Sequence, residues 1–261
     1  ISPLLQPKRT HSQLANYDFT GKVLVLTGAS GGIGRATAKY FFDCGANVAL
    51  TYHRNEAIKE MIGELDPSGK RFLATKIDLS NSNACDYFAA QCQDRFGQVD
   101  FLVNNAAVLR MAPVETMSDE MWREVMAINL DSVFYLCRTF LPILRKGGAI
   151  VNIASTAAHR GAVDHAAYAA SKAAVLAFSR SLARELAPRI RCNGLSPGMI
   201  DTEMLRELPE EVLQGLRDES PYKRLGNPDE IAGAIAFLCS EDATFITAET
   251  LHVNGACYIS S

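Results

Sequence analysis

The sequence has no long hydrophobic run and no concentration of charge of one sign. No stretch approaches the roughly 18 apolar residues that cross a membrane, so we expect no membrane association. The net charge is only −3, with acidic and basic residues interspersed. This pattern argues against nucleic acid as a partner, because phosphate binding needs a clustered basic field. Small molecules and proteins remain as partners.

The seven cysteines form no Cys-x-x-Cys pair, and their number is odd. Most lie in apolar segments, which is typical of small buried side chains. We therefore expect free thiols, no metal site and a reducing compartment, the cytoplasm. An organelle matrix or stroma is the alternative. It rests on residues 1–19, an N-terminal extension with the composition of a disordered lead-in or a transit-peptide remnant.

What the sequence does have is an alternation of strands and helices. Short β-branched runs predict strands at 22–27, 47–52, 71–77, 100–103, 149–154, 191–195 and 250–253. Amphipathic segments predict helices at 33–42, 83–96, 118–144, 164–186 and 228–238, and a polar helix follows the second strand and ends at residue 65. The alternation predicts an α/β fold with one Rossmann-like domain over residues 20–261. We expect a doubly wound parallel sheet of about seven strands with helices on both faces.

A charged, partly helical insertion at 198–226 follows the sixth predicted strand. Ligands of such sheets bind outside the carboxyl ends of the strands. The insertion is therefore a predicted lid over the substrate.

A glycine-rich turn, TGASGGIG (27–34), joins the first predicted strand to the first helix. Glycines let the backbone approach a pyrophosphate, and a helix N-terminus offers free N–H donors. The predicted dinucleotide site contains Gly28, Ser30, Gly31, Gly32, Ile33 and Gly34. The same letters match G-x-S-x-G, the nucleophile elbow of serine hydrolases. A hydrolase that uses Ser30 is therefore a distant alternative.

The residues after the second and third strands help to select the nucleotide. No acid follows the second strand before Glu56, although NAD sites usually place one there to hold the ribose hydroxyls. Arg54, helped by His53, is positioned to grip a 2′-phosphate, so we predict NADP(H) rather than NAD(H). Further predicted cofactor contacts are Asp78 and Leu79, near the adenine, and Asn105, Ala106 and Ala107, along the cleft.

Tyr168 and Lys172 lie four residues apart in a predicted helix and therefore share one face. An adjacent ammonium is expected to lower the tyrosine pKa from its ordinary value of about 10. Ser155 ends the fifth strand at the carboxyl edge, where its hydroxyl is placed to bond a substrate carbonyl. These residues predict carbonyl reduction or alcohol oxidation, with Tyr168 transferring the proton and a nicotinamide the hydride. Asn129, polar in an apolar helix, needs a partner such as a bound water.

Taken together, TGASGGIG, Asn-Asn-Ala-Ala (104–107), Asn129, Ser155, Tyr-Ala-Ala-Ser-Lys (168–172) and Pro197-Gly198 resemble the short-chain dehydrogenase/reductase family over nearly the whole chain. The resemblance implies a catalytic tetrad of Asn129, Ser155, Tyr168 and Lys172. It implies that Lys172 also binds the nicotinamide ribose and that Asn129 holds a water in the proton relay. Tyr168, Lys172, Pro197, Gly198, Ile200 and Thr202 complete the implied cofactor contacts. Ala107 stands where the family usually has glycine.

Within this family, residues 181–185 and 249–255 resemble 3-oxoacyl-[acyl-carrier-protein] reductases of fatty acid biosynthesis. The resemblance implies NADP(H)-dependent reduction of a 3-oxoacyl thioester held on an acyl carrier protein. Arg145, Lys146 and Arg189 match basic positions that meet this acidic partner. The resemblance also implies a homotetramer formed through the two long helices and the last strand. Sugar, polyol, steroid or xenobiotic carbonyls remain alternative substrates.

Overall fold

The protein is described by a computed structural model that covers residues 17–206 and 209–259. Most of the predicted N-terminal extension and residues 207–208 of the predicted lid lie outside the described residues. Seven parallel strands form one sheet in the order β3-β2-β1-β4-β5-β6-β7. The strands are β1 (Val23–Leu26), β2 (Asn47–Tyr52), β3 (Phe72–Lys76), β4 (Val99–Asn104), β5 (Leu144–Ile153), β6 (Arg191–Pro197) and β7 (Thr250–Val253). The predicted doubly wound sheet is confirmed.

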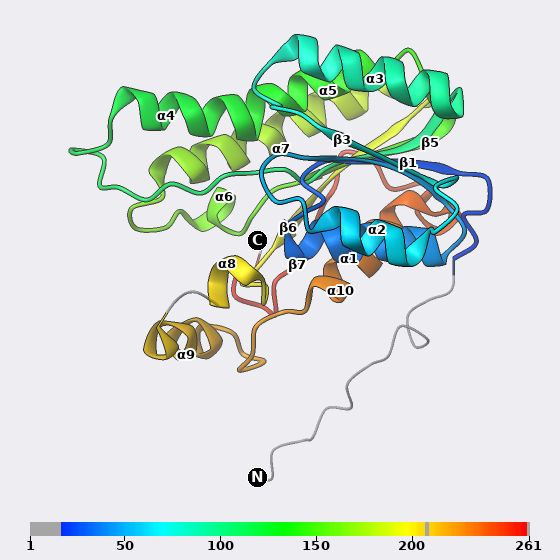
Figure 1. Ribbon diagram of the computed structural model, residues 1–261. Coiled ribbons are helices and arrows are strands. Elements are labelled where there is room, and N and C mark those ends of the chain that lie inside the picture. Colours follow the sequence, from blue (N-terminus) through cyan, green and yellow to red (C-terminus); the bar gives the residue numbers. More distant parts are fainter. Residues whose placement is uncertain (1–16, 207–208, 260–261) are drawn as a thin grey trace.

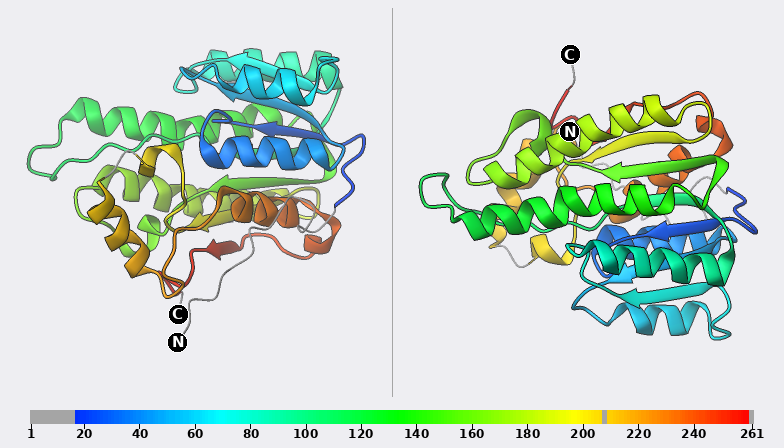
Figure 2. Two further views of the ribbon diagram at one scale, coloured as in Figure 1. Left: turned by 60° about the horizontal axis from the view of Figure 1, so that its bottom comes forward. Right: turned by 90° about the horizontal axis from the view of Figure 1, so that it is seen from above.

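Helices cover both faces of the sheet (Figure 1). One face carries α1 (Gly32–Asp43), α2 (Ile58–Leu65) and α10 (Pro228–Cys239). The other carries α3 (Ser82–Phe96), α4 (Asp119–Met126), α5 (Ser132–Phe140) and α7 (Ala166–Leu186), which are seen from above in Figure 2. The one-turn helices α6 (Ala157–Arg160) and α8 (Glu203–Arg206) and the longer α9 (Glu210–Glu219) gather at the carboxyl ends of the strands.

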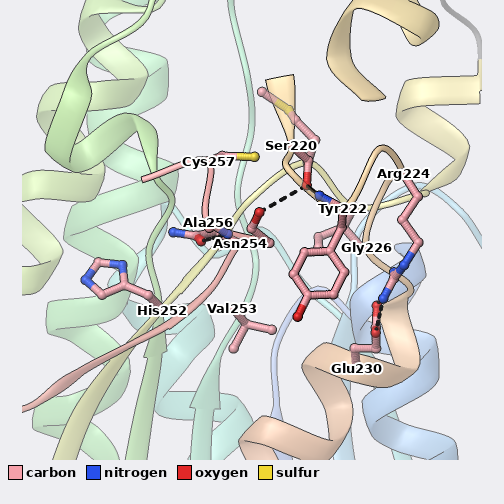
Figure 3. A pocket seen from close by; sticks show the side chains of 13 residues that line it. Ser220, Tyr222, Arg224, Gly226, Glu230, His252, Val253, Asn254, Ala256 and Cys257 are labelled. Atoms are coloured by element: carbon pink, nitrogen blue, oxygen red, sulfur yellow. Dashed lines mark hydrogen bonds and ion pairs between the residues drawn. The ribbon is translucent and has the colours of Figure 1, made fainter. Parts of the chain in front are cut away.

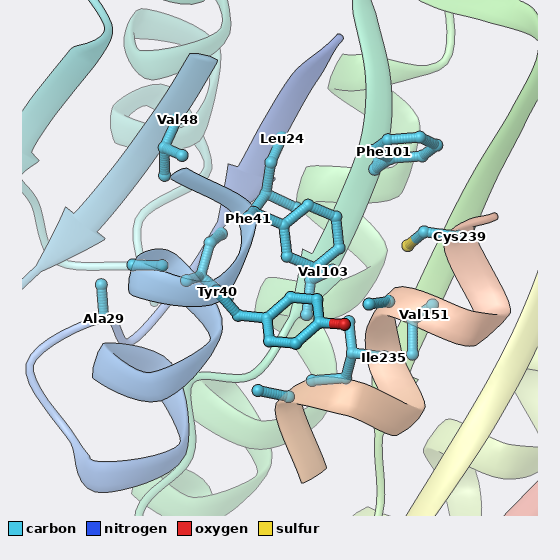
Figure 4. Packing of buried hydrophobic residues seen from close by; sticks show 14 of the residues in the cluster. Leu24, Ala29, Tyr40, Phe41, Val48, Phe101, Val103, Val151, Ile235 and Cys239 are labelled. Carbon is cyan, nitrogen blue, oxygen red and sulfur yellow. The ribbon is translucent and has the colours of Figure 1, made fainter. Parts of the chain in front are cut away.

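A hydrophobic core lies on each face of the sheet. In the core under α1 and α10, the rings of Tyr40 and Phe41 pack beside Val103, Val151 and Ile235 (Figure 4). The second core lies under α3, α5 and α7. Side chains on both faces of the central strands are buried, as expected when helices cover a parallel sheet on both sides. The loops at the carboxyl edge therefore rest on a rigid support.

The long predicted helix at 118–144 is wrong in two respects. A π-helical turn, Ala127–Asp131, separates α4 from α5. The helix also ends at Phe140, and Leu144 already belongs to β5. Pro142 explains the early end, because it lacks the N–H that continues a helix. The apolar residues Ile143 and Leu144 fit the spacing of a helix, but they are buried where β5 begins.

All seven cysteines are free, as predicted. Within the described ranges, no helix is both long and apolar enough to span a bilayer. The same residues contain no group of three or more His, Cys, Asp or Glu side chains able to hold a metal ion.

Candidate active site

Three of the predicted catalytic side chains meet at the carboxyl edge of the sheet. Ser155 lies two residues beyond the end of β5, and Tyr168 and Lys172 project from the first turns of α7. A side-chain hydrogen bond links Ser155 to Tyr168. The Lys172 Nζ atom lies 5.9 Å from the centre of the Tyr168 ring. It donates a hydrogen bond of 2.7 Å to the carbonyl oxygen of Ile153, the last residue of β5.

The pKa of Tyr168 differs from the sequence-based expectation. Burial of the phenol raises its pKa above the ordinary value, and the hydrogen bond with Ser155 offsets only part of that rise. Burial also lowers the pKa of Lys172 to about 8. The expected lowering of the phenol pKa by the ammonium is therefore wrong. Removal from water outweighs the influence of a cation that points at the Ile153 carbonyl.

Asn129 is fully buried at the centre of the π-helical turn. Its Oδ1 accepts from the Val108 N–H at 2.8 Å. Its Nδ2 donates to the Val108 carbonyl at 3.0 Å and to Ser171 Oγ at 3.1 Å. Both amide donors are thus taken by protein acceptors. The predicted need of the Asn129 side chain for a partner is thus met by the loop after β4 and by α7.

The glycine turn packs tightly at the switch point between β1 and β4, where the strand order reverses. Gly28 has φ +66°, and a Cβ there would lie 2.7 Å from the Ala106 Cα. A Cβ on Gly34 would overlap the Gly28 carbonyl oxygen. Helix α1 begins after Gly31 with no side-chain cap, so its first N–H groups face the turn without a side-chain acceptor. This arrangement suits an anionic pyrophosphate.

Polar side chains gather at the end of β2, where the sequence predicts the second part of a nucleotide site. His53 and Arg54 are exposed just beyond this strand. Glu56 bonds Lys59 and Lys76 at 2.9 Å each, which lowers its pKa to about 2. The hydroxyl of Thr51, buried at the end of β2, has no hydrogen-bond partner among the described residues. The end of β2 therefore carries exposed basic groups and a buried hydroxyl without a hydrogen-bond partner among the described residues.

The side chains of other predicted cofactor residues are engaged in contacts within the protein. The Asn105 amide donates to the carbonyls of Thr27 and Gly28 at 2.9 and 3.1 Å, which ties the loop after β4 to the glycine turn. Leu79 is buried in the second core. The Asp78 carboxylate accepts from Ser80 N–H and Oγ at 2.9 and 2.8 Å, which lowers its pKa. The Leu79 side chain is therefore not available to an adenine.

The predicted lid is tied at both ends. Gly226 N–H donates to Met199 O, and Asp201 N–H donates to Gly226 O, each at 2.8 Å. Thr202 packs on the glycine turn, because a Cβ on Gly32 would lie 3.0 Å from its Cγ2. The side chain of Ile200 is buried in the first core. Farther along, Arg160 of α6 pairs with Glu219 of α9 at 2.7 Å.

A cavity of about 400 Å³ lies where the lid segment rejoins the body (Figure 3). It is lined by Tyr222 and Arg224 on one side and, on the other, by His252 of β7 and by residues that follow this strand, including Cys257. Arg224 forms a two-pronged ion pair with Glu230. The cavity contains none of the predicted catalytic side chains. We therefore place the candidate active site at Tyr168 and not in this cavity.

The basic residues predicted to meet a carrier protein lie away from this site. Arg145 and Lys146 are in the first residues of β5, and Arg189 precedes β6, so all three lie at the amino ends of these strands. Gly147 N–H bonds the Arg189 carbonyl at 2.8 Å. The active-site residues lie at the opposite edge of the sheet.

Sequence reasoning missed several residues that build the site. Thr27 Oγ1 accepts the N–H groups of Asn105 and Ala106 at 3.1 Å each. Val108 and Ser171 hold Asn129, and helix α6 was not predicted. The sequence offered one signal for these contacts. Ser171 lies between Tyr168 and Lys172 in a predicted helix, and its hydroxyl requires a partner if that face of the helix is buried.

A doubly wound parallel sheet, a glycine turn at its switch point and a Ser–Tyr–Lys set at its carboxyl edge define a nucleotide-dependent oxidoreductase. A family model described as enoyl-(acyl carrier protein) reductase matches residues 28–256. The chain is 38% identical over 244 residues to the 3-oxoacyl-[acyl-carrier-protein] reductase FabG of Salmonella typhimurium, covering 92% of this chain and 99% of the relative. It is 36% identical over 238 residues to nodulation protein G of Azospirillum brasilense, covering 90% and 97%.

Among solved structures, a short-chain dehydrogenase/reductase of Brucella melitensis, named as a glucose/ribitol dehydrogenase, matches with a TM-score of 0.91. It is 44% identical, and the match covers 94% of this chain and 100% of that one. The chain belongs to the short-chain dehydrogenase/reductase family and is an oxidoreductase. The serine hydrolase alternative finds no support. Within the described part of the chain, no hydrogen bond joins Ser30 to a histidine, and His159 pairs with Ser196.

Proposed function

We propose that this oxidoreductase uses NADPH to reduce the 3-oxo group of an acyl thioester, with Tyr168 as the proton donor. The observation that carries the proposal is the meeting of Ser155, Tyr168 and Lys172 at the edge of the sheet that also holds the glycine turn. The names of the relatives support the substrate class, because FabG proteins of 35–38% identity are 3-oxoacyl-[acyl-carrier-protein] reductases.

A bound nicotinamide cofactor supplies the hydride for the carbonyl carbon. Tyr168 gives its proton to the carbonyl oxygen, and the Ser155 hydroxyl holds that oxygen in place. A raised phenol pKa suits this direction, because the tyrosine then keeps its proton at neutral pH. Lys172, whose Nζ lies 5.9 Å from the centre of the Tyr168 ring, would hold the ribose of the cofactor by hydrogen bonding.

The residues of the nucleotide cleft fit such a cofactor. The uncapped start of α1 and the close approach at Gly28 suit a pyrophosphate. Engagement of Glu56 by Lys59 and Lys76 supports a preference for NADPH. The Glu56 carboxylate, four residues beyond the end of β2, is thereby held in ion pairs, and the exposed Arg54 stays available for a 2′-phosphate.

Oxidation of a polyol is the second candidate function. The observation that favours it is the 44% identity to the Brucella melitensis protein, whose name is glucose/ribitol dehydrogenase. The same acid–base set serves either direction, so residues outside this set decide between the substrates. Transfer of the substrate by a carrier protein, closure of residues 198–226 over it, and assembly as a homotetramer complete the proposal and remain predictions.

The test is an assay of NADPH oxidation with acetoacetyl thioesters on coenzyme A and on acyl carrier protein, beside NADP⁺ reduction with ribitol. We expect turnover with the thioesters. Tyr168→Phe should lower kcat by about 100-fold or more while the protein stays folded, because the proton donor is lost. Turnover with ribitol alone would favour the second candidate. Full activity of Tyr168→Phe would contradict the assigned chemistry.

A further inference from the structure

A continuous set of hydrogen bonds connects the loop after β4 to the backbone of Tyr168. The Val108 backbone holds both polar groups of the Asn129 side chain, at 2.8 and 3.0 Å. Asn129 Nδ2 then donates to Ser171 Oγ at 3.1 Å. Ser171 Oγ donates in turn to the carbonyl oxygen of Tyr168 at 2.7 Å. Three separate elements are thereby joined at the residue assigned to proton transfer.

Both side chains in this set are fully buried, Asn129 and Ser171 each at 0% exposure. Water cannot replace a lost partner at such a position, so every bond in the set carries more weight than one at the surface. Among the described contacts, Ser171 is the only residue whose side chain bonds both the π-helical turn, through Asn129, and the backbone of Tyr168.

The start of α7 needs such a link. The helix begins at Ala166, and the preceding His165 makes no side-chain cap bond. Tyr168 is therefore in an uncapped first turn, where helices fray most readily. The phenol must nonetheless stay within hydrogen-bond distance of a carbonyl oxygen, and a misplacement of about 1 Å costs a large part of the rate.

We propose that Ser171 is a positioning residue that fixes Tyr168 for proton transfer by bonding its carbonyl and anchoring it to Asn129. The inference rests on the proposed function of Tyr168. Ser171 itself touches neither substrate nor cofactor. Its neighbour Lys172 is held separately through the Ile153 carbonyl.

The chain provides a matched control on the same helix. Ser179 is also buried, donates to a backbone carbonyl (Val175, 2.7 Å) and accepts from an asparagine amide (Asn152 Nδ2, 2.8 Å). It lies two turns farther along α7. Ser171→Ala and Ser179→Ala therefore remove the same kind of hydroxyl, and only the first is bonded to the backbone of Tyr168.

We expect Ser171→Ala to lower kcat for NADPH-dependent reduction by about tenfold or more, with KM for NADPH changed less than about twofold. The alkaline limb of the kcat profile should move to higher pH. A displaced phenol loses the bond with Ser155 that offsets its raised pKa. Ser179→Ala should keep kcat within about twofold and the limb unmoved. Ser171→Cys, nearly isosteric and a weak donor, should fall between Ser171→Ala and the wild type.

The proposal is overturned if Ser171→Ala matches Ser179→Ala in kcat and pH profile, or if Ser171→Cys has the full wild-type kcat. If Ser171→Ala does not fold, the kcat of Ser171→Cys tests the proposal instead. Tyr168→Phe is measured in the same assay. If it is inactive while Ser171→Ala is normal, only the positioning role fails. If Tyr168→Phe is active, the proposed function itself fails.

Discussion

Lys172 is a buried cation whose burial costs free energy. Its side chain is 2% exposed, and its ammonium group donates a hydrogen bond to the Ile153 carbonyl. No neighbouring acid contributes to its pKa, which burial lowers from 10.5 to about 8. A buried charge without a counter-ion is rare outside functional sites. The ligand-free fold therefore retains a lysine that weakens it.

We predict that Lys172→Met stabilises the ligand-free protein at pH 7 while abolishing its activity. The fall in the lysine pKa from 10.5 to about 8 corresponds to a penalty of about 3 kcal/mol on the charged form, and loss of the bond to Ile153 offsets about 1 kcal/mol. The unfolded chain binds the proton up to about pH 10.5 and the folded chain only up to about pH 8. Wild-type stability should therefore rise across that window.

Urea unfolding of both proteins between pH 7 and 10 measures this difference. The stability advantage of Lys172→Met should shrink as the pH rises above about 8. An advantage that stays constant with pH, or a methionine variant less stable than the wild type at pH 7, would show that burial is not the main influence on this lysine.

At the scale of elements, the β1–α1 turn is held by contacts of backbone with backbone. Gly28 combines a left-handed φ of +66° with an approach to Ala106 that leaves no room for a side chain. A Cβ added to Gly63, which lies within α2, would meet no other side chain or neighbouring element within 4 Å. Alanine at Gly28 therefore tests a crowded turn, and alanine at Gly63 tests an uncrowded position in a helix.

We predict opposite effects of alanine at these two positions. Gly28→Ala should lower the free energy of unfolding by about 1–2 kcal/mol or more through the strained φ, and it should weaken NADPH binding. Gly63→Ala should raise the free energy of unfolding by about 0.5–1 kcal/mol. Thermal unfolding and NADPH titration by fluorescence measure both quantities. Equal NADPH affinity in Gly28→Ala and the wild type would argue against a pyrophosphate at this turn.

How far the sequence predicts these elements depends on the cause of each boundary. Strands buried on both faces were found because their apolar runs end at turn residues, as with Asn47–Tyr52. The π-helical turn was not predicted, because the apolar pattern around Asn129 continues through it. Its cause is tertiary, namely the bonds from Asn129 to Val108 and Ser171. No local preference in the sequence records such contacts.

On the scale of the whole molecule, the topology brings distant residues to one edge. Parallel strands in the order 3-2-1-4-5-6-7 place the ends of β1, β4, β5 and β6 side by side, so Gly28, Asn105, Ser155 and Gly198 share one rim. This convergence was predictable once the strands were, because ligands bind beyond the carboxyl ends of such sheets. The pKa of Tyr168 was not, because burial depends on packing that spacing does not reveal.

The central claim is that a hydride from NADPH reaches the carbonyl carbon while Tyr168 protonates the oxygen. The most direct measurement uses NADPH with deuterium at both C4 positions, 3-oxoacyl thioester as substrate, and mass and NMR analysis of the product. The account predicts one deuterium on the new carbinol carbon, an intact thioester and almost no product with Tyr168→Phe. Product without that deuterium, or a hydrolysed thioester, would contradict it.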